Sequence, residues 1–265
     1  MSTHRQRPAG GAIITALAAF AVLLFAGIAQ GGNKPTTVEA GNLLFTFNGG
    51  FNPTKLPRKK LAPISLNASG SIKTKDGSHP PALKEVEIET DKNGAVNVTG
   101  LPVCTAGKLQ SRDTAAAEKA CSGAIIGKGQ TKVEVALAEQ RPIPVKSKLV
   151  AFNGGTKGGT TTFYIHAFFS APVTGAIVTT VKIKRIHKGR YGLLSTASIP
   201  KIAGGNGSVK SFNLVINRRY TYKGKKMSVL SAKCADGKLQ AHATAIFADG
   251  TKAGADIIRT CTPTG

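Results

Sequence analysis

From residue 41 to the C-terminus, apolar and polar residues alternate in short runs. In "LKEVEIET", Val86 and Ile88 fall on one side of an extended chain, with the three glutamates on the other, as is typical of a half-buried strand. The same alternation recurs in "TKVEVALA", "TTFYIHAFF", "GAIVTTVKIKRIH" and "LQAHATAIF". Turns rich in Gly and Asp separate these runs, so the sequence predicts an all-β fold, an antiparallel β-sandwich or meander.

Two local segments carry more specific expectations. "SRDTAAAEKA" offers Ser111 or Asp113 as an N-cap with alanines behind it, which predicts one short helix near residues 112–121. "DKNG" followed by "AVNVTG" predicts a β-hairpin that continues from the strand ending near Thr90.

The N-terminus has a different pattern from the rest of the chain. Arg5 and Arg7 precede an uncharged apolar run, and Gly27 and Ala29 supply the small residues of a cleavage site. This predicts a signal peptide at residues 1–29, although the run is also long enough for an uncleaved signal anchor. We expect a linker at 30–40 and a β-sandwich domain at 41–265, either as one unit or as two lobes divided near 125–145.

Four cysteines follow this export segment, an even number that favours disulfides. Three pairings are possible, and the spacing favours Cys104 with Cys121 and Cys234 with Cys261, because each pair lies within one local unit. Zinc sites usually need cysteines two to four residues apart or closely spaced histidines, and neither pattern occurs here. We therefore expect cross-links, with no metal and no cofactor.

Catalytic patterns are weak. The sequence contains no G-x-S-x-G, H-E-x-x-H or G-x-x-x-x-G-K-[ST] motif, and its acids stand singly in turns or on alternating strand positions. His166, within "FYIHAFF", is expected to be a buried histidine, whereas His242 alternates with polar residues and is expected to be exposed. No residue is assigned a catalytic role, and the composition favours a non-catalytic protein.

Charge is the most informative feature of the composition. The chain carries 36 basic against 13 acidic residues, a formal net charge of +23, which should attract it to anionic surfaces. If the strands between 176 and 260 form an up-and-down meander, the turns at 188–189, 223–224 and 250–251 meet at one end. That end would gather the candidate residues for binding an anionic partner: Lys182, Lys184, Arg185, Lys188, Arg190, Arg218, Arg219, Lys223, Lys225 and Lys226. The alternative is a solvated face that keeps the protein soluble.

The scarcity of Trp and Tyr argues against one class of anionic partner, single-stranded nucleic acids. The chain has no Trp and four Tyr, few for the stacking platforms that bind single-stranded nucleic acids. We therefore expect anionic envelope polymers or a phospholipid surface rather than a specific nucleic acid. Contact with the interior of a membrane would come only from an uncleaved N-terminal helix.

Several stretches together resemble a known group. "LPRKKLAPISL", "GLPVC", "YGLLSTASIPKIAGGNGSVKSFNLVI" and "LSAKCADGKL" are similar to exported, four-cysteine proteins of high-GC Gram-positive bacteria, over roughly residues 40–265. That family has no known activity, so the resemblance implies no functional residues. It implies a secreted protein or one on the extracytoplasmic face of the cell envelope.

Two classes of function follow. The first is an exported, non-catalytic envelope or secreted protein that contacts anionic polymers through its basic end. The alternative is an extracytoplasmic hydrolase whose site is assembled from residues distant in the sequence. A concave pocket where His166, acids and backbone donors converge would favour the hydrolase.

Overall fold

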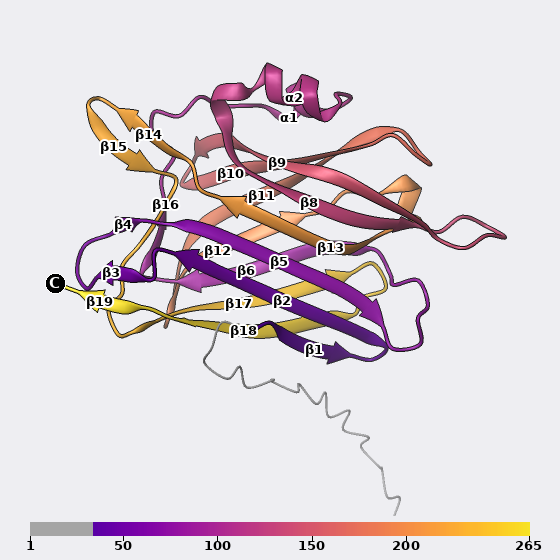
Figure 1. Cartoon of the computed structure of the whole chain (residues 1–265), viewed down its shortest axis with the longest axis horizontal. Coiled ribbons are helices and arrows are strands. Elements are labelled where there is room, and N and C mark those ends of the chain that lie inside the picture. Colours follow the sequence, from indigo (N-terminus) through magenta and orange to yellow (C-terminus); the bar gives the residue numbers. More distant parts are fainter. Residues whose placement is uncertain (1–33) are drawn as a thin grey trace, which may run out of the picture.

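The computed structural model describes residues 34–265 and is drawn in Figure 1. From residue 34 onward it contains nineteen strands, two short α-helices and two 3-10 turns, so the predicted all-β class is confirmed. The predicted signal peptide or anchor lies outside the described residues. Within 34–265, no helix combines the length and the apolar character that a membrane-spanning helix needs.

One antiparallel sheet of twelve strands forms most of the fold (Figure 1). In the order in which they lie side by side, the strands are β1 (Thr36–Ala40), β2 (Leu43–Asn52), β5 (Ser65–Thr74), β13 (Gly207–Ile216), β8 (Ile125–Val135), β9 (Ile143–Lys157), β10 (Thr160–Phe169), β11 (Gly175–Lys188), β12 (Tyr191–Ser198), β6 (Leu83–Asp91), β17 (Lys238–Phe247) and β18 (Lys252–Thr260). Five of these eleven neighbouring pairs are not consecutive in sequence, because strands from both halves of the chain insert between one another.

The sheet curls until its two edge strands meet. β1 and β18, the first and last in this order, contact each other, and Figure 1 draws them side by side. Phe45 and Phe47 of β2 pack there against small residues of β17 and β18 and against Phe247 in a buried cluster. A second cluster lies between β8, β9, β10, β11 and β13 and includes Ile126, Val133 and Phe163. Apolar burial on the concave face therefore holds the curled sheet together.

Three expectations about organisation are corrected. Thr36–Ala40, placed in the linker at 30–40, forms β1 and pairs with β2. The segment 125–145, considered as a division between lobes, contributes β8 and the start of β9 to the middle of the continuous sheet. The strands after residue 176 do not form a simple meander, because β12 pairs with β6 and β13 pairs with β5 and β8.

Small strands gather at one end of the sheet, at the left of Figure 1. They are β4 (Ala62–Pro63), β16 (Leu230–Ala232) and β7 (Gly94–Val96) in one group, β3 (Lys55–Pro57) beside β19 (Thr262–Thr264), and the hairpin of β14 (Arg219–Tyr222) and β15 (Lys225–Ser228). The expected hairpin between "LKEVEIET" and "AVNVTG" is wrong, because β7 pairs with β16 instead of β6.

Both predicted disulfides are present, Cys104–Cys121 and Cys234–Cys261. The first encloses α1 (Ala106–Leu109) and α2 (Thr114–Ala120), and the 3-10 turn η1 (Ser122–Ala124) follows it. Asp113 caps α2 by accepting a hydrogen bond from the backbone N–H of Ala116, which is the cap geometry that its sequence predicts. The second 3-10 turn, η2 (Ala203–Gly205), precedes β13.

Candidate functional site: an apolar cavity with a basic hollow at one end

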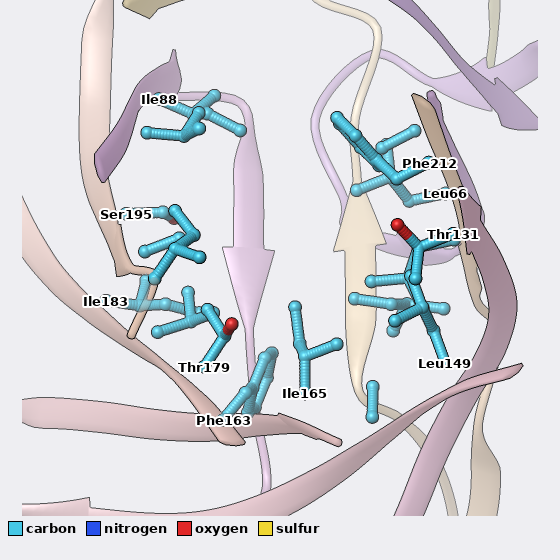
Figure 2. Close-up of a pocket in the computed structure, with 18 of the residues that line it drawn as sticks. Leu66, Ile88, Thr131, Leu149, Phe163, Ile165, Thr179, Ile183, Ser195 and Phe212 are labelled. Carbon is cyan, nitrogen blue, oxygen red and sulfur yellow. The ribbon is translucent and has the colours of Figure 1, made fainter. Parts of the chain in front are cut away.

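The concave face of the sheet encloses a cavity of about 310 Å³. Eight adjacent strands, from β5 to β6 in the sheet order, turn side chains into it, and β7 and β16 line one end. Figure 2 shows Ile88, Ser195 and Ile183 on one side of this space and Leu66, Thr131 and Phe212 across from them. The residues come from both halves of the chain, so the cavity exists only once the sheet has curled.

The lining of the cavity is chemically simple. Its polar side chains are the hydroxyls of threonine and serine, such as Thr179 and Ser195. Thr131 donates its hydroxyl hydrogen to the carbonyl oxygen of Ser211 at 3.0 Å, so this hydroxyl is already bonded. Among the described residues, no Asp, Glu, His, Cys, Lys or Arg lines the cavity. An uncharged lining of this kind favours alkyl or aromatic groups over ions.

A second, more polar hollow of about 750 Å³ adjoins one end of the cavity. Its walls are the turn after β6, β7 and the loop after it, and the adjacent ends of β9, β10, β11 and β12. The two spaces share five lining residues: Gly94, Ala95, Val96, Ile183 and Leu193. The basic members of its lining are Lys92, Lys184, Arg185 and His187, and no acidic residue of the described chain is among them.

Five of the predicted basic residues lie on β11 and the turn after it, and they differ in surroundings. Lys182 and Lys184 are exposed, and the strand register puts them on the opposite face from Ile183. Lys188 forms an ion pair with Glu89 at 2.8 Å. Arg190 donates its Nε–H to Asp91 at 2.7 Å and also pairs with Asp236, whose pKa it lowers. Only Arg185 among the five faces the side of the sheet on which the cavity lies.

The other five lie at or beside the β14–β15 hairpin. Arg219, Lys223, Lys225 and Lys226 are exposed, whereas Arg218 is half-buried. The hairpin docks on the loop after β7: the Tyr220 hydroxyl donates to the carbonyl oxygen of Thr99 at 2.9 Å. Because that loop also lines the polar hollow, both groups of basic residues lie at one end of the fold.

The third turn of the expected basic end lies elsewhere. Phe247, just before the turn at 250–251, pairs with Leu83 at the start of β6, whereas Tyr191 pairs with Asp91 at its end. The turn at 250–251 is therefore at the opposite end of the sheet from the turn at 188–189. The cause is the strand order. β6 lies between β12 and β17 and is antiparallel to both, so β17 runs in the opposite direction from the one it would have in a meander.

His166 is fully buried, as predicted, but it does not face the cavity. Its neighbours Ile165 and Ala167 on β10 line the cavity, so alternation turns the imidazole to the other face, beneath the α1–α2 segment. Its Nε2 lies 3.0 Å from the carbonyl oxygen of Arg112, and burial lowers its pKa below the ordinary value. His242, expected to be exposed, is part-exposed and lies 2.7 Å from Asp256.

Sequence reasoning missed the cavity altogether. Ile177, Thr179, Val181 and Ile183 follow the ordinary alternation of a strand that packs on a filled core, and no residue among them marks a hollow. Within residues 34–265, no group of three or more His, Cys, Asp or Glu side chains is placed to hold a metal ion. Comparison with known protein families, with curated proteins and with solved structures finds no match to this chain.

Proposed function

We propose that this is an exported, non-catalytic protein that binds an apolar ligand in the cavity of the curled sheet. The observation that carries the proposal is the enclosed volume, which reaches the range of small-molecule sites, about 300–1,000 Å³. Its walls are almost entirely apolar side chains, which would forfeit packing contacts if the space between them stayed empty.

The chemistry of the lining supports binding over hydrolysis. A hydrolase needs an acid, a base or an activated nucleophile aimed at its substrate. The threonine and serine hydroxyls of the cavity have no imidazole, carboxylate or amine beside them in the lining of the described chain. His166, the histidine that would support the alternative, faces the opposite side of β10.

The expected setting of this binding is outside the cytoplasm. Two disulfides are consistent with an oxidising, extracytoplasmic compartment. The apolar N-terminal segment and the resemblance to exported four-cysteine proteins extend this to secretion or to the cell envelope.

The test is binding of the neutral fluorescent probe N-phenyl-1-naphthylamine to the whole, oxidised chain. We expect saturable binding that Ser195→Phe abolishes, because Ser195 points into the cavity (Figure 2) and a phenyl ring would occupy that space. Thr196→Phe is the matched control, since the next residue along β12 faces the other side of the sheet. Equal binding by all three proteins, or no saturable binding to any, would reject the cavity as a ligand site.

One observation favours a second candidate function, contact with an anionic polymer. The exposed side chains of Arg219, Lys223, Lys225 and Lys226 share one hairpin, and within residues 34–265 none of them has an acidic ion-pair partner. Charges that are clustered and unpaired attract polyanions more strongly than charges that are already neutralised.

A further inference from the structure

The polar hollow and the apolar cavity meet at the ends of β7, β11 and β12, so one ligand can occupy both. We propose that the ligand is an anionic amphiphile with a single alkyl chain, which lies in the cavity while its anionic head lies in the basic hollow. This inference rests on the proposed function and names the class of ligand. The shared wall of Gly94, Val96, Ile183 and Leu193 is the place where chain and head would join.

The row of side chains on β11 leads from one environment to the other. Ile177, Thr179, Val181 and Ile183 line the cavity at alternate positions. Arg185 is the next member of this row: it pairs directly with Leu193, which lines both spaces. Since alternate residues of a strand share a face, the Arg185 guanidinium emerges on the cavity side of the sheet where the apolar row ends.

β6 ends in the same way. Ile88 and Thr90 line the cavity, and Lys92, in the turn that follows, lines the hollow. The Lys92 amine donates to the carbonyl oxygen of Gly189 at 3.3 Å, which places it beside the turn between β11 and β12. β11 and β6, which lie on either side of β12, thus both change from apolar to basic side chains at the same end of the sheet.

The charge of the hollow is not neutralised by its surroundings. Lys92, Arg185 and His187 line it together with Lys184, whose side chain turns to the outer face of β11, and no acidic residue of the described chain is among the lining residues. The carboxylates nearest in sequence are engaged elsewhere: Glu89 pairs with Lys188, and Asp91 pairs with Arg190. Asn97, Thr99, Thr156 and Thr161 add amide and hydroxyl groups to the wall. An anionic head would therefore meet charge-assisted donors, with Arg185 suited to bind two oxygens at once.

The volume and the apolar lining of the cavity determine which kind of ligand tail can fit. A volume of about 310 Å³ lies at the lower end of the range of small-molecule sites, which suits one medium-length alkyl chain. A charged head cannot follow the tail inside, since burying an unpaired charge in an apolar space is costly. The ligand is thus oriented with its anion at the Arg185 end.

The experiment measures displacement of N-phenyl-1-naphthylamine from the whole, oxidised chain by three ligands with the same tail: dodecanoate, dodecyl phosphate and dodecanol. We expect both anions to bind at least about tenfold more tightly than the alcohol, as loss of a charged hydrogen bond would predict. Added salt should reduce this advantage, because it screens exposed charges. The relative affinities of dodecanoate and dodecyl phosphate distinguish a fatty-acid head from a phosphate head.

Two charge-reversal variants locate the head. Arg185→Glu should lose roughly tenfold or more in affinity for the anions and little for dodecanol. Lys182→Glu makes the same change of charge on the outer face of the same strand and should behave as the wild type. Equal affinities for the three ligands, or equal losses in both variants, would overturn the anionic head while leaving the apolar site standing. Failure of all three ligands to bind, together with no saturable probe binding, would instead overturn the proposed function.

Discussion

Ile183 and Arg185 lie two residues apart on the same face of β11, one buried in the cavity lining and the other exposed in the basic hollow beyond it. The strand pleat sets their shared direction, and the curl of the sheet gives each a different environment. The position of an apolar cavity directly beside a basic hollow is the feature that most directly suggests an amphiphilic ligand.

Arg190 makes several contacts within the protein. It connects three parts of one end of the sheet, since it pairs with Asp91, with Asp236 and with the carbonyl oxygen of Lys238 at 2.7 Å. Asp91 is 1% exposed, so Arg190→Ala would leave a buried carboxylate without its cation. We expect a loss of about 3 kcal/mol in the free energy of unfolding, measured by urea denaturation.

Arg185→Ala is the control for this prediction, because its side chain is exposed and no ion pair involving it occurs within residues 34–265. It should change the free energy of unfolding by no more than about 0.5 kcal/mol. A loss of no more than about 0.5 kcal/mol from Arg190→Ala as well would show that the network around Arg190 adds little stability.

His166 should make the fold sensitive to acid. Burial lowers the pKa of the folded-state imidazole below the ordinary 6.5, so the unfolded chain takes up this proton first. The contribution of His166 to stability is therefore constant above about pH 6.5 and declines as the pH falls below that value. In denaturation curves between pH 5 and 8, His166→Gln should lose this part of the decline.

His187→Gln is the matched control, since His187 is exposed at the end of β11. It should keep the wild-type decline of stability below pH 6.5. If His166→Gln and the wild type had parallel stability curves over the whole range, the buried imidazole would not be a source of acid sensitivity.

The Cys234–Cys261 bridge should be a major source of stability. It links residues 27 apart, and its sulfurs pack with Leu56, Ile64 and Ala232 beneath the small strands. Replacing both cysteines by alanine should lower the free energy of unfolding by about 3–4 kcal/mol, chiefly because the unfolded chain gains freedom. Guanidinium denaturation without reductant measures this change.

The Cys104–Cys121 pair provides the comparison, because it links residues only 17 apart. Replacing Cys104 and Cys121 by alanine should lower the free energy of unfolding somewhat less, by about 3 kcal/mol, if the entropy of the unfolded chain is the main cause. A change below about 1 kcal/mol on removal of the longer link would argue against that cause here.

The contribution of the β14–β15 hairpin to polyanion binding can be distinguished from the contribution of the net charge. Reversing Arg219, Lys223, Lys225 and Lys226 to Glu should weaken binding to a polyanion such as heparin, and the wild-type interaction should fall with added salt. The control reverses four other exposed lysines: Lys55, Lys59, Lys60 and Lys73. Equal losses from the two sets, measured on immobilised polyanion at low and moderate salt, would mean that net charge alone drives the attraction.

The sequence by itself determined the local features of this protein. Alternation predicted that Val86 and Ile88 face inward, and both line the cavity. Cysteine spacing favoured the two disulfides that the structure contains, and Asp113 was one of two expected N-caps. These features depend on strand pleat, short-range chain closure and backbone hydrogen bonding, all of which act between residues close in the sequence.

Only the tertiary structure decided which strands are neighbours and what their inward faces surround. β6 lies between β12 and β17, which begin 100 and 147 positions after its last residue, and Arg190 meets Asp91 across 99 positions. Ile183 and Phe212 would have the same pattern in a filled core, because alternation specifies a face and not the distance to the opposite wall. The curl of the twelve-stranded sheet sets that distance, and with it the cavity and the role of Arg185 at its end.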